Sequence, residues 1–254
     1  ALSLSVLNPG EIAATAGTSG VVYGVGETAD YDPQSRVNTF VHVNHTNEEP
    51  RYGVLLCLNG TGIQNSWLKQ NAVSYGETQA SYGEMNEIAS SVPVGSDGVV
   101  ILPFGNGAER SLGNRDISAS IHGLNFNTHS RAHLIRASQE GIVFALNYGI
   151  EIMRSIGVDV SKVRAGEANM FLSPIFREAF ASVTDAVVEL YNTDGSQGAA
   201  RGAGIGAGIF SSVSEAFHGL EAQDVIEPES SKAEQYKSAY NKWRTILDSE
   251  LQRG

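Results

Sequence analysis

The sequence lacks several features that mark particular classes of protein. Its 254 residues include a single cysteine, Cys57, which excludes an internal disulfide and is compatible with a reducing cytoplasm. No apolar run approaches the roughly 20 residues that cross a bilayer, and the first residues, ALSLSVLNPGE, lack the basic region of a signal peptide. We therefore expect a soluble, cytoplasmic protein that has no membrane partner.

Basic residues are also scarce. The chain carries 17 lysine and arginine residues against 28 aspartate and glutamate residues, which gives a formal net charge of −11. A charge of this sign opposes binding to the nucleic-acid backbone, and no basic stripe is interleaved with aromatic residues. We expect no nucleic-acid partner. The sequence does not determine the oligomeric state, and a homodimer is compatible with it.

Motifs for three kinds of site are absent as well. No run fits the GxxxxGK(S/T) pattern of a P-loop, so any nucleotide must be held in another way. His129 and His133 stand four residues apart without the glutamate of a zinc-binding HExxH pattern, and we expect the chain to form no metal site. The glycines of RGAGIGAG, residues 201–208, lack the strand-then-turn context of a dinucleotide fingerprint and indicate close helix packing.

The first half of the chain predicts strands before helices. With 41% hydrophobic residues, the chain can bury a sizeable core. Short apolar segments at residues 11–17, 21–25 and 37–43 predict three neighbouring antiparallel strands. A helix is predicted over residues 62–72 and a buried strand over residues 98–104. We interpret the polar stretch between them, rich in Gly, Ser and Glu, as a lid or an insertion.

Helices and strands alternate in the second half. A long helix is predicted from about Ser130 to Ile156, with Gly157 after its end, and Ser173 is expected to cap a helix that starts at Pro174. The strand AVVELY, a helix of small residues and a final helix follow. The final helix is expected to begin with a capping box and to bury one apolar stripe. The capping box is Ser231 with Glu234, and the stripe is Tyr236, Tyr240, Trp243, Leu247 and Leu251.

This order of elements is that of the ribonuclease-H-like unit found in actin-type ATPases. It predicts an α/β fold in which a mixed five-stranded sheet, with three antiparallel strands first, is flanked by helices. No fixed repeat and no long linker divides the chain. We therefore expect one domain over residues 1–254.

The stretch ATAGTSGVVYG, residues 14–24, allows three interpretations. A serine hydrolase needs GxSxG at a strand-to-helix elbow, whereas Gly17, Thr18, Ser19 and Gly20 lead into another strand. A phosphate site suits these residues better, because glycines permit close approach and consecutive backbone N–H groups can point at one anion. An ordinary hairpin turn is the third interpretation. The stretch alone leaves all three open.

Segments along nearly the whole chain resemble, in order, the C-terminal domain of the FGGY carbohydrate kinases, most closely the xylulokinases. NPGEIAATAGTSGVVYG is similar to the family's phosphate hairpin, and FGNGAERS is similar to its NGER loop. The other matching segments are LNGTGIQNSWLK, THSRAHLIRASQEGIVFAL, RAGEANMFLSPIFREAFASV and GAARGAGIGAG. Each segment is moderately specific, and their shared order makes the resemblance stronger than any one of them.

The resemblance implies ATP-dependent phosphorylation of a sugar hydroxyl, with MgATP as donor and D-xylulose as the expected acceptor. It assigns three groups of residues to the nucleotide. The phosphates would be held by Gly17, Thr18, Ser19 and Gly20, the nucleotide wall shaped by Gly60 and Gln64, and the adenosine pocket formed by Gly166, Glu167, Ala168 and Asn169.

Two departures from the family pattern accompany the resemblance. The adenosine motif is usually GGG followed by a small residue, whereas here residues 165–169 read AGEAN. The general-base Asp of the family is expected just upstream of Ala1, together with a sugar-binding N-terminal domain, so we assign no catalytic residue within this chain. We expect the isolated chain to bind nucleotide without phosphorylating sugar. The alternatives are a non-catalytic actin-fold binding or regulatory module and a serine hydrolase centred on Ser19.

Overall fold

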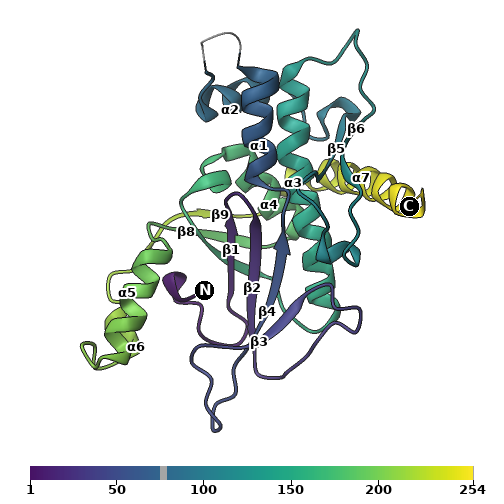
Figure 1. Ribbon diagram of the computed structural model, residues 1–254. Helices are drawn as coiled ribbons and strands as arrows, with labels where there is room; N and C mark the ends of the chain where they lie inside the picture. The colour runs from purple at the N-terminus through teal and green to yellow at the C-terminus, as the bar shows by residue number, and fades with distance from the viewer. Residues whose placement is uncertain (75–78, 254) are drawn as a thin grey trace.

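A mixed sheet of seven strands lies at the centre of the computed structural model, which describes residues 1–74 and 79–253 (Figure 1). The strand order is β3-β4-β2-β1-β7-β8-β9. The parallel pairs are β1 with β7 and β7 with β8, and the remaining neighbours are antiparallel. The strands are β1 (Ile12–Ala16), β2 (Gly20–Gly26), β3 (Asn38–Val41), β4 (Tyr52–Leu58), β7 (Lys162–Gly166), β8 (Val187–Tyr191) and β9 (Ala222–Ile226).

The predicted α/β class and helix-flanked mixed sheet are confirmed, but the predicted number of five strands is wrong. Strand β4 was not predicted, and it lies between β2 and β3, so the second and third predicted strands are not neighbours. The strand predicted at residues 98–104 exists as β5 (Val100–Phe104). It pairs with β6 (Ser118–His122) in a separate two-stranded sheet. Local pattern identified this strand correctly, whereas its pairing partner lies too far along the chain for local pattern to specify.

The helices follow the predicted segments closely. Helix α1 (Gly62–Leu68) continues as the π-helical turn η2 (Lys69–Val73). The polar stretch contains α2 (Tyr82–Ser90), which was not predicted; residues 75–78 of that stretch lie outside the described residues. The other helices are α3 (Arg131–Ser155), α4 (Pro174–Thr184), α5 (Gly195–Gly206), α6 (Val213–Ala216) and α7 (Ala233–Arg253).

The predicted N-caps of α3 and α4 are confirmed, whereas the predicted capping box of α7 is wrong. Ser130 and Ser173 accept hydrogen bonds from backbone amides as N-caps, and Gly157 adopts the left-handed conformation after α3, with φ of 89°. The capping box of Ser231 with Glu234 does not form. The Ser231 hydroxyl instead donates to Glu229 Oε1 over 2.7 Å, because a short 3₁₀ turn precedes α7.

One large core joins the sheet to α3, α4 and α7. From α3, Ile142 and Leu146 pack with Val22 and Leu56 of the sheet. The predicted stripe of α7 is confirmed, since Tyr236, Trp243 and Leu247 are buried in this core and Tyr240 and Leu251 pack against it. No helix among the described residues is long and apolar enough to cross a membrane.

Glycines in two helices allow close backbone approach. A Cβ on Gly198 of α5 would lie 2.7 Å from Ser3 N, and one on Gly202 would lie 2.7 Å from Leu2 Cδ2. The predicted close packing of this helix is thus present, and its partner is the N-terminal segment. In α3, a Cβ on Gly141 would lie 2.3 Å from the Ile101 carbonyl oxygen of β5. A backbone atom cannot swing aside as a side chain can, so Gly141 fixes how closely α3 approaches β5.

We therefore predict that Gly141→Ala lowers the free energy of unfolding by about 1–3 kcal/mol through overpacking, although alanine is the better helix former. Gly206→Ala at the end of α5 is the matched control, because a Cβ there would have nothing within 4 Å. It should be neutral or stabilising by up to about 1 kcal/mol. Urea unfolding of the three proteins measures both effects. Equal stability of Gly141→Ala and the parent chain would contradict the close α3–β5 contact.

Candidate functional site

The turn between β1 and β2 is held by the beginning of α1. Ala16 pairs with Gly20, which leaves residues 17–19 as the turn. Gly62 N donates to the Gly17 carbonyl over 2.8 Å, and Ile63 N donates to the Thr18 carbonyl over 3.2 Å. The Thr61 hydroxyl lies 3.0 Å from each of these two carbonyls. Helix N-termini normally have unpaired N–H groups, and here those of α1 fix the turn.

We call these hydrogen bonds from residues 61–63 to the carbonyls of Gly17 and Thr18 the clamp. The clamp orients the amides of the turn. A trans peptide places its C=O and the following N–H on opposite sides, and no cis peptide occurs in the described chain. Because the carbonyls of Gly17 and Thr18 point toward α1, the amides of Thr18 and Ser19 point away from it. Neither amide donates to another backbone group in the part of the chain that the structure describes. Consecutive free amides of this kind make an anion-binding concavity.

Glycine is required on both sides of the clamp. A Cβ on Gly62 would lie 2.4 Å from the Gly17 carbonyl oxygen, and one on Gly20 would lie 2.6 Å from Thr61 Cγ2. Any larger residue at either position would push α1 away from the turn. Gly62 therefore permits close approach of two backbone segments, and Gly20 leaves room for the Thr61 side chain.

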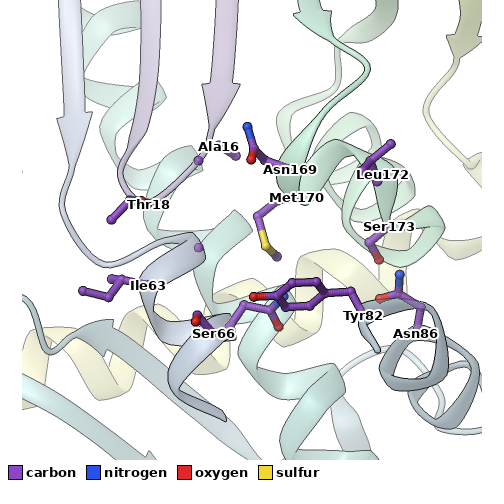
Figure 2. A pocket seen from close by; sticks show the side chains of 13 residues that line it. Ala16, Thr18, Ile63, Ser66, Tyr82, Asn86, Asn169, Met170, Leu172 and Ser173 are labelled. Carbon is purple, nitrogen blue, oxygen red and sulfur yellow. The ribbon is translucent and has the colours of Figure 1, made fainter. Parts of the chain in front are cut away.

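A pocket of about 550 Å³ opens beside the turn (Figure 2). Its walls are the β1–β2 turn, the first turns of α1, the start of α2 and the 3₁₀ turn η5 (Asn169–Leu172). Figure 2 shows Asn169 close to Ala16, with Met170 and Tyr82 reaching across the space toward α1. The turn after β7 thus faces the same pocket as the β1–β2 hairpin.

Polar groups in the pocket are held by α3. Gln139, fully buried, donates from Nε2 to Asn86 Oδ1 over 2.8 Å and accepts from Ser173 Oγ over 2.6 Å. It thereby ties the α2 wall to the wall that follows β7. Asn65 on α1 is 7% exposed, and its Oδ1 has no hydrogen-bond partner among the described residues. This oxygen can therefore accept a hydrogen bond from a group that enters the pocket.

The structure brings three of the predicted site residues together at this pocket: Gly17, Thr18 and Asn169. Asn169 has φ of 54°, a left-handed conformation that Asn tolerates well. Ser19 and Gly20 belong to the same hairpin, and Gly166, Glu167 and Ala168 lead from β7 to Asn169, but none of these five lines the pocket.

Gly60 and Gln64 also lie outside the pocket lining. A Cβ on Gly60 would lie 1.6 Å from the Pro103 carbonyl oxygen, so this glycine permits packing against β5. Gln64 turns toward α3, where its Nε2 donates to Ser138 Oγ over 2.9 Å.

Five polar lining residues were not among the predicted site residues, and one of them, Ser173, was expected only as the cap of α4. Asn65 and Ser66 directly follow Gln64 on the predicted helix, while Tyr82 and Asn86 come from the unpredicted α2. A signal for α2 was present, because Ser81 and Glu84 have the spacing of a capping box and form one in the structure.

The described residues form neither a serine-hydrolase site centred on Ser19 nor a metal site of three or more ligands. Ser19 is followed by a strand rather than a helix, and no hydrogen bond joins it to a histidine among the described residues, so the serine-hydrolase arrangement is absent there. Within residues 1–74 and 79–253, no group of three or more His, Cys, Asp or Glu side chains could hold a metal ion.

A buried carboxylate lies behind the clamp. Glu109 is 0% exposed and accepts hydrogen bonds from Asn59 N over 2.8 Å and Gly60 N over 3.2 Å. Burial raises the pKa of Glu109 to about 7, and the two amide hydrogen bonds oppose that rise only in part. Its charge therefore changes near neutral pH.

Comparison with solved structures defines the class of fold. Xylulose kinase from Rhodospirillum rubrum matches with a TM-score of 0.82 at 26% identity, covering 98% of this chain and 49% of that one. The mixed sheet with its flanking helices is the fold of the actin-like ATPases, in the form found in sugar kinases.

Sequence comparison defines the family. The model of the FGGY family of carbohydrate kinases, C-terminal domain, matches residues 12–209, and the chain belongs to this family. Xylulose kinase of Bacillus subtilis (strain 168) is 26% identical over 251 residues, 97% of this chain and 48% of the relative. Gluconokinase of the same organism is 28% identical over 151 residues, 57% of this chain and 28% of the relative. The chain thus spans half or less of the length of these curated relatives.

We predict that the Glu109 carboxyl makes stability depend on pH. Between pH 4.5 and about 7, the folded protein holds a proton on Glu109 that the unfolded chain has lost. The free energy of unfolding should therefore fall as pH rises through this window, by at most about 3 kcal/mol at roughly 1.4 kcal/mol per pKa unit. Urea unfolding across the window, compared with Glu109→Gln, isolates this contribution. Identical pH slopes in the two proteins would refute it.

Proposed function

We propose that the chain is the nucleotide-binding domain of a sugar kinase that transfers a phosphoryl group from MgATP to a ketopentose hydroxyl, converting D-xylulose to xylulose 5-phosphate. The observation that carries this proposal is the pair of free amides at Thr18 and Ser19, in a turn that shares a pocket with Asn169. Membership of the FGGY family supplies the reaction class.

The phosphate end of the nucleotide belongs at the β1–β2 turn. No lysine or arginine lines the pocket within residues 1–74 and 79–253, so the donors proposed for the phosphates are the backbone amides of the turn, with the Thr18 hydroxyl beside them. Among the residues that the structure describes, no carboxylate lines it either, so these residues offer donors to phosphate oxygens rather than ligands to a metal. Mg²⁺ bound to the β- and γ-phosphates neutralises part of their charge.

The base and ribose belong at the other wall. Met170 and Leu172 supply apolar surface for a flat ring, and the side-chain amide of Asn169 supplies both a donor and an acceptor. Asn65 Oδ1, which lacks a partner among the described residues, can accept a hydrogen bond from the nucleotide. The pocket volume of about 550 Å³ suits a ligand of this size.

Sugar binding and proton abstraction are assigned to the rest of the full-length protein. The described part of the pocket lining has no carboxylate that could act as a general base, and the chain spans about half of its xylulose kinase relative. General-base catalysis is typically worth about 10² to 10⁴ in rate, and substrate positioning adds more. The chain by itself therefore binds nucleotide but does not phosphorylate sugar at a useful rate. D-xylulose is the proposed sugar because the curated xylulose kinase relative matches 97% of this chain, whereas the gluconokinase matches 57%.

Asn169→Gly should weaken binding of MgADP by about 2- to 10-fold, as expected for loss of one neutral hydrogen bond. Glycine keeps the positive φ and removes only the side chain. The matched control is Asp185→Gly, which has the same backbone conformation, with φ of 51°, at the end of α4 and outside the pocket. Isothermal titration calorimetry measures all three proteins. Absence of heat with MgADP and MgATP in the folded parent chain would overturn the nucleotide assignment.

The full-length protein that contains this chain should phosphorylate D-xylulose faster than gluconate in a coupled ADP-release assay. The chain alone should give no turnover, and adding the preceding domain should restore it. A full-length protein that binds MgATP without phosphorylating either sugar would favour the non-catalytic binding module. Turnover by the isolated chain at enzyme-like rates would place the general base within these residues instead.

A further inference from the structure

Glu109 holds the loop that carries the clamp on the β1–β2 turn. Both carboxylate oxygens accept from Asn59 N, over 2.8 and 3.1 Å, and Oε1 also accepts from Gly60 N over 3.2 Å. The neighbouring carbonyl of Ala108 accepts from Asn59 Nδ2 over 3.0 Å. No ion pair joins Glu109 to a cation among the described residues. The charge of this buried carboxylate is therefore balanced by backbone amides alone.

The loop has little freedom to move. On one side, the Gly60 Cα faces the Pro103 carbonyl, where an added Cβ would lie only 1.6 Å from the oxygen. On the other side, Thr61 and Gly62 hold the carbonyls of Gly17 and Thr18. The amides that bind Glu109 and the groups that clamp the turn are consecutive in the chain. A shift of the first group is thus passed to the second through one or two rigid peptide units.

We propose that Glu109 is a positioning residue for phosphate binding: its ionised carboxylate fixes residues 59–62, which in turn hold the carbonyls of Gly17 and Thr18 and so set the direction of the Thr18 and Ser19 amides. The effect of Glu109 on MgADP binding rests on the proposed nucleotide function. The coupling between Glu109 and the turn does not depend on that function. Glu109 itself does not line the pocket, so it acts through the loop and not by contact with the nucleotide.

Because the pKa of Glu109 lies near neutral pH, the strength of its hydrogen bonds to Asn59 and Gly60 should depend on pH. The titratable group that faces it from β4 is the Cys57 thiol, whose pKa is raised by burial first and then by the charge of Glu109, while Arg110 acts in the opposite direction. Below the pKa of Glu109, of about 7, one oxygen carries a proton and the grip on Asn59 and Gly60 weakens. Phosphate binding should weaken with it.

The first test compares MgADP affinity of the parent chain and Glu109→Gln by calorimetry above and below the pKa of Glu109. Glutamine keeps the volume but has one accepting oxygen, so affinity should fall by about 5-fold or more above that pKa, in line with the loss of a charged hydrogen bond. The ratio of the two affinities should approach one as pH falls. Protonation of the nucleotide cancels in this ratio.

Glu11→Gln is the matched control, because Glu11 also accepts two backbone amides, of Leu7 and Asn8, but at the opposite end of β1. It should bind MgADP as the parent chain does at every pH. A pH-independent ratio for Glu109→Gln, or tighter binding on protonation, would overturn the positioning role while leaving the nucleotide function intact. Absence of MgADP binding by the folded parent chain would instead be the failure of the proposed function.

The second test needs no ligand. In ¹⁵N-resolved spectra of the parent chain and of Glu11→Gln, the amides of Asn59, Gly60, Thr18 and Ser19 should titrate together with a midpoint near 7, the pKa of Glu109. In Glu109→Gln this titration should disappear. Titration confined to Asn59 and Gly60 would show that the coupling stops before the turn, and the proposal would be wrong. The parent spectra decide this even if Glu109→Gln fails to fold.

Discussion

The hydrogen bonds from the beginning of α1 to the β1–β2 turn are the interaction on which the rest of the site depends. The N-terminal amides of a helix are commonly available to an anion. Here Gly62 and Ile63 donate instead to the carbonyls of the turn, so the amides left free are those of Thr18 and Ser19. The free amides therefore lie on the hairpin and not at the helix end, and the hairpin borders the pocket beside Asn169.

This arrangement is how an acidic chain can offer a site to a polyanion. The chain has a net charge of −11, and no basic side chain is among the described residues that line the pocket. Backbone dipoles act at short range and are fixed in direction, so they attract phosphate locally without a positive surface. Backbone amides can bind an anion in this way only if the backbone that carries them is held rigidly. Gly20, Gly62 and the buried carboxylate of Glu109 therefore matter to the proposed phosphate site although none of them provides a side-chain contact to it.

Helix α3 connects this site to the core. Gly141 brings it against β5, and its buried Gln139 joins Asn86 to Ser173 across the pocket. The same helix packs its apolar side chains on the sheet that carries the hairpin. The relative position of the pocket walls is therefore set by a long, fully packed helix rather than by the loops themselves. The fold and the family make this a pocket of an FGGY C-terminal domain, and the proposed function assigns the sugar chemistry to residues outside this chain.

The sequence by itself determined the features that arise from neighbouring residues: the hairpin at residues 14–24, the caps of α3 and α4, the stripe of α7, and the ordered motifs that identify the family. Only the tertiary structure decided that β4 lies between β2 and β3, that β5 leaves the main sheet, and that Tyr82 and Asn86 reach the pocket. It also placed Gly60 and Gln64 against β5 and α3 instead of in the pocket lining. Helical periodicity and capping are local, whereas strand pairing and pocket walls join residues far apart in the chain, and their choice is made by packing of the whole core.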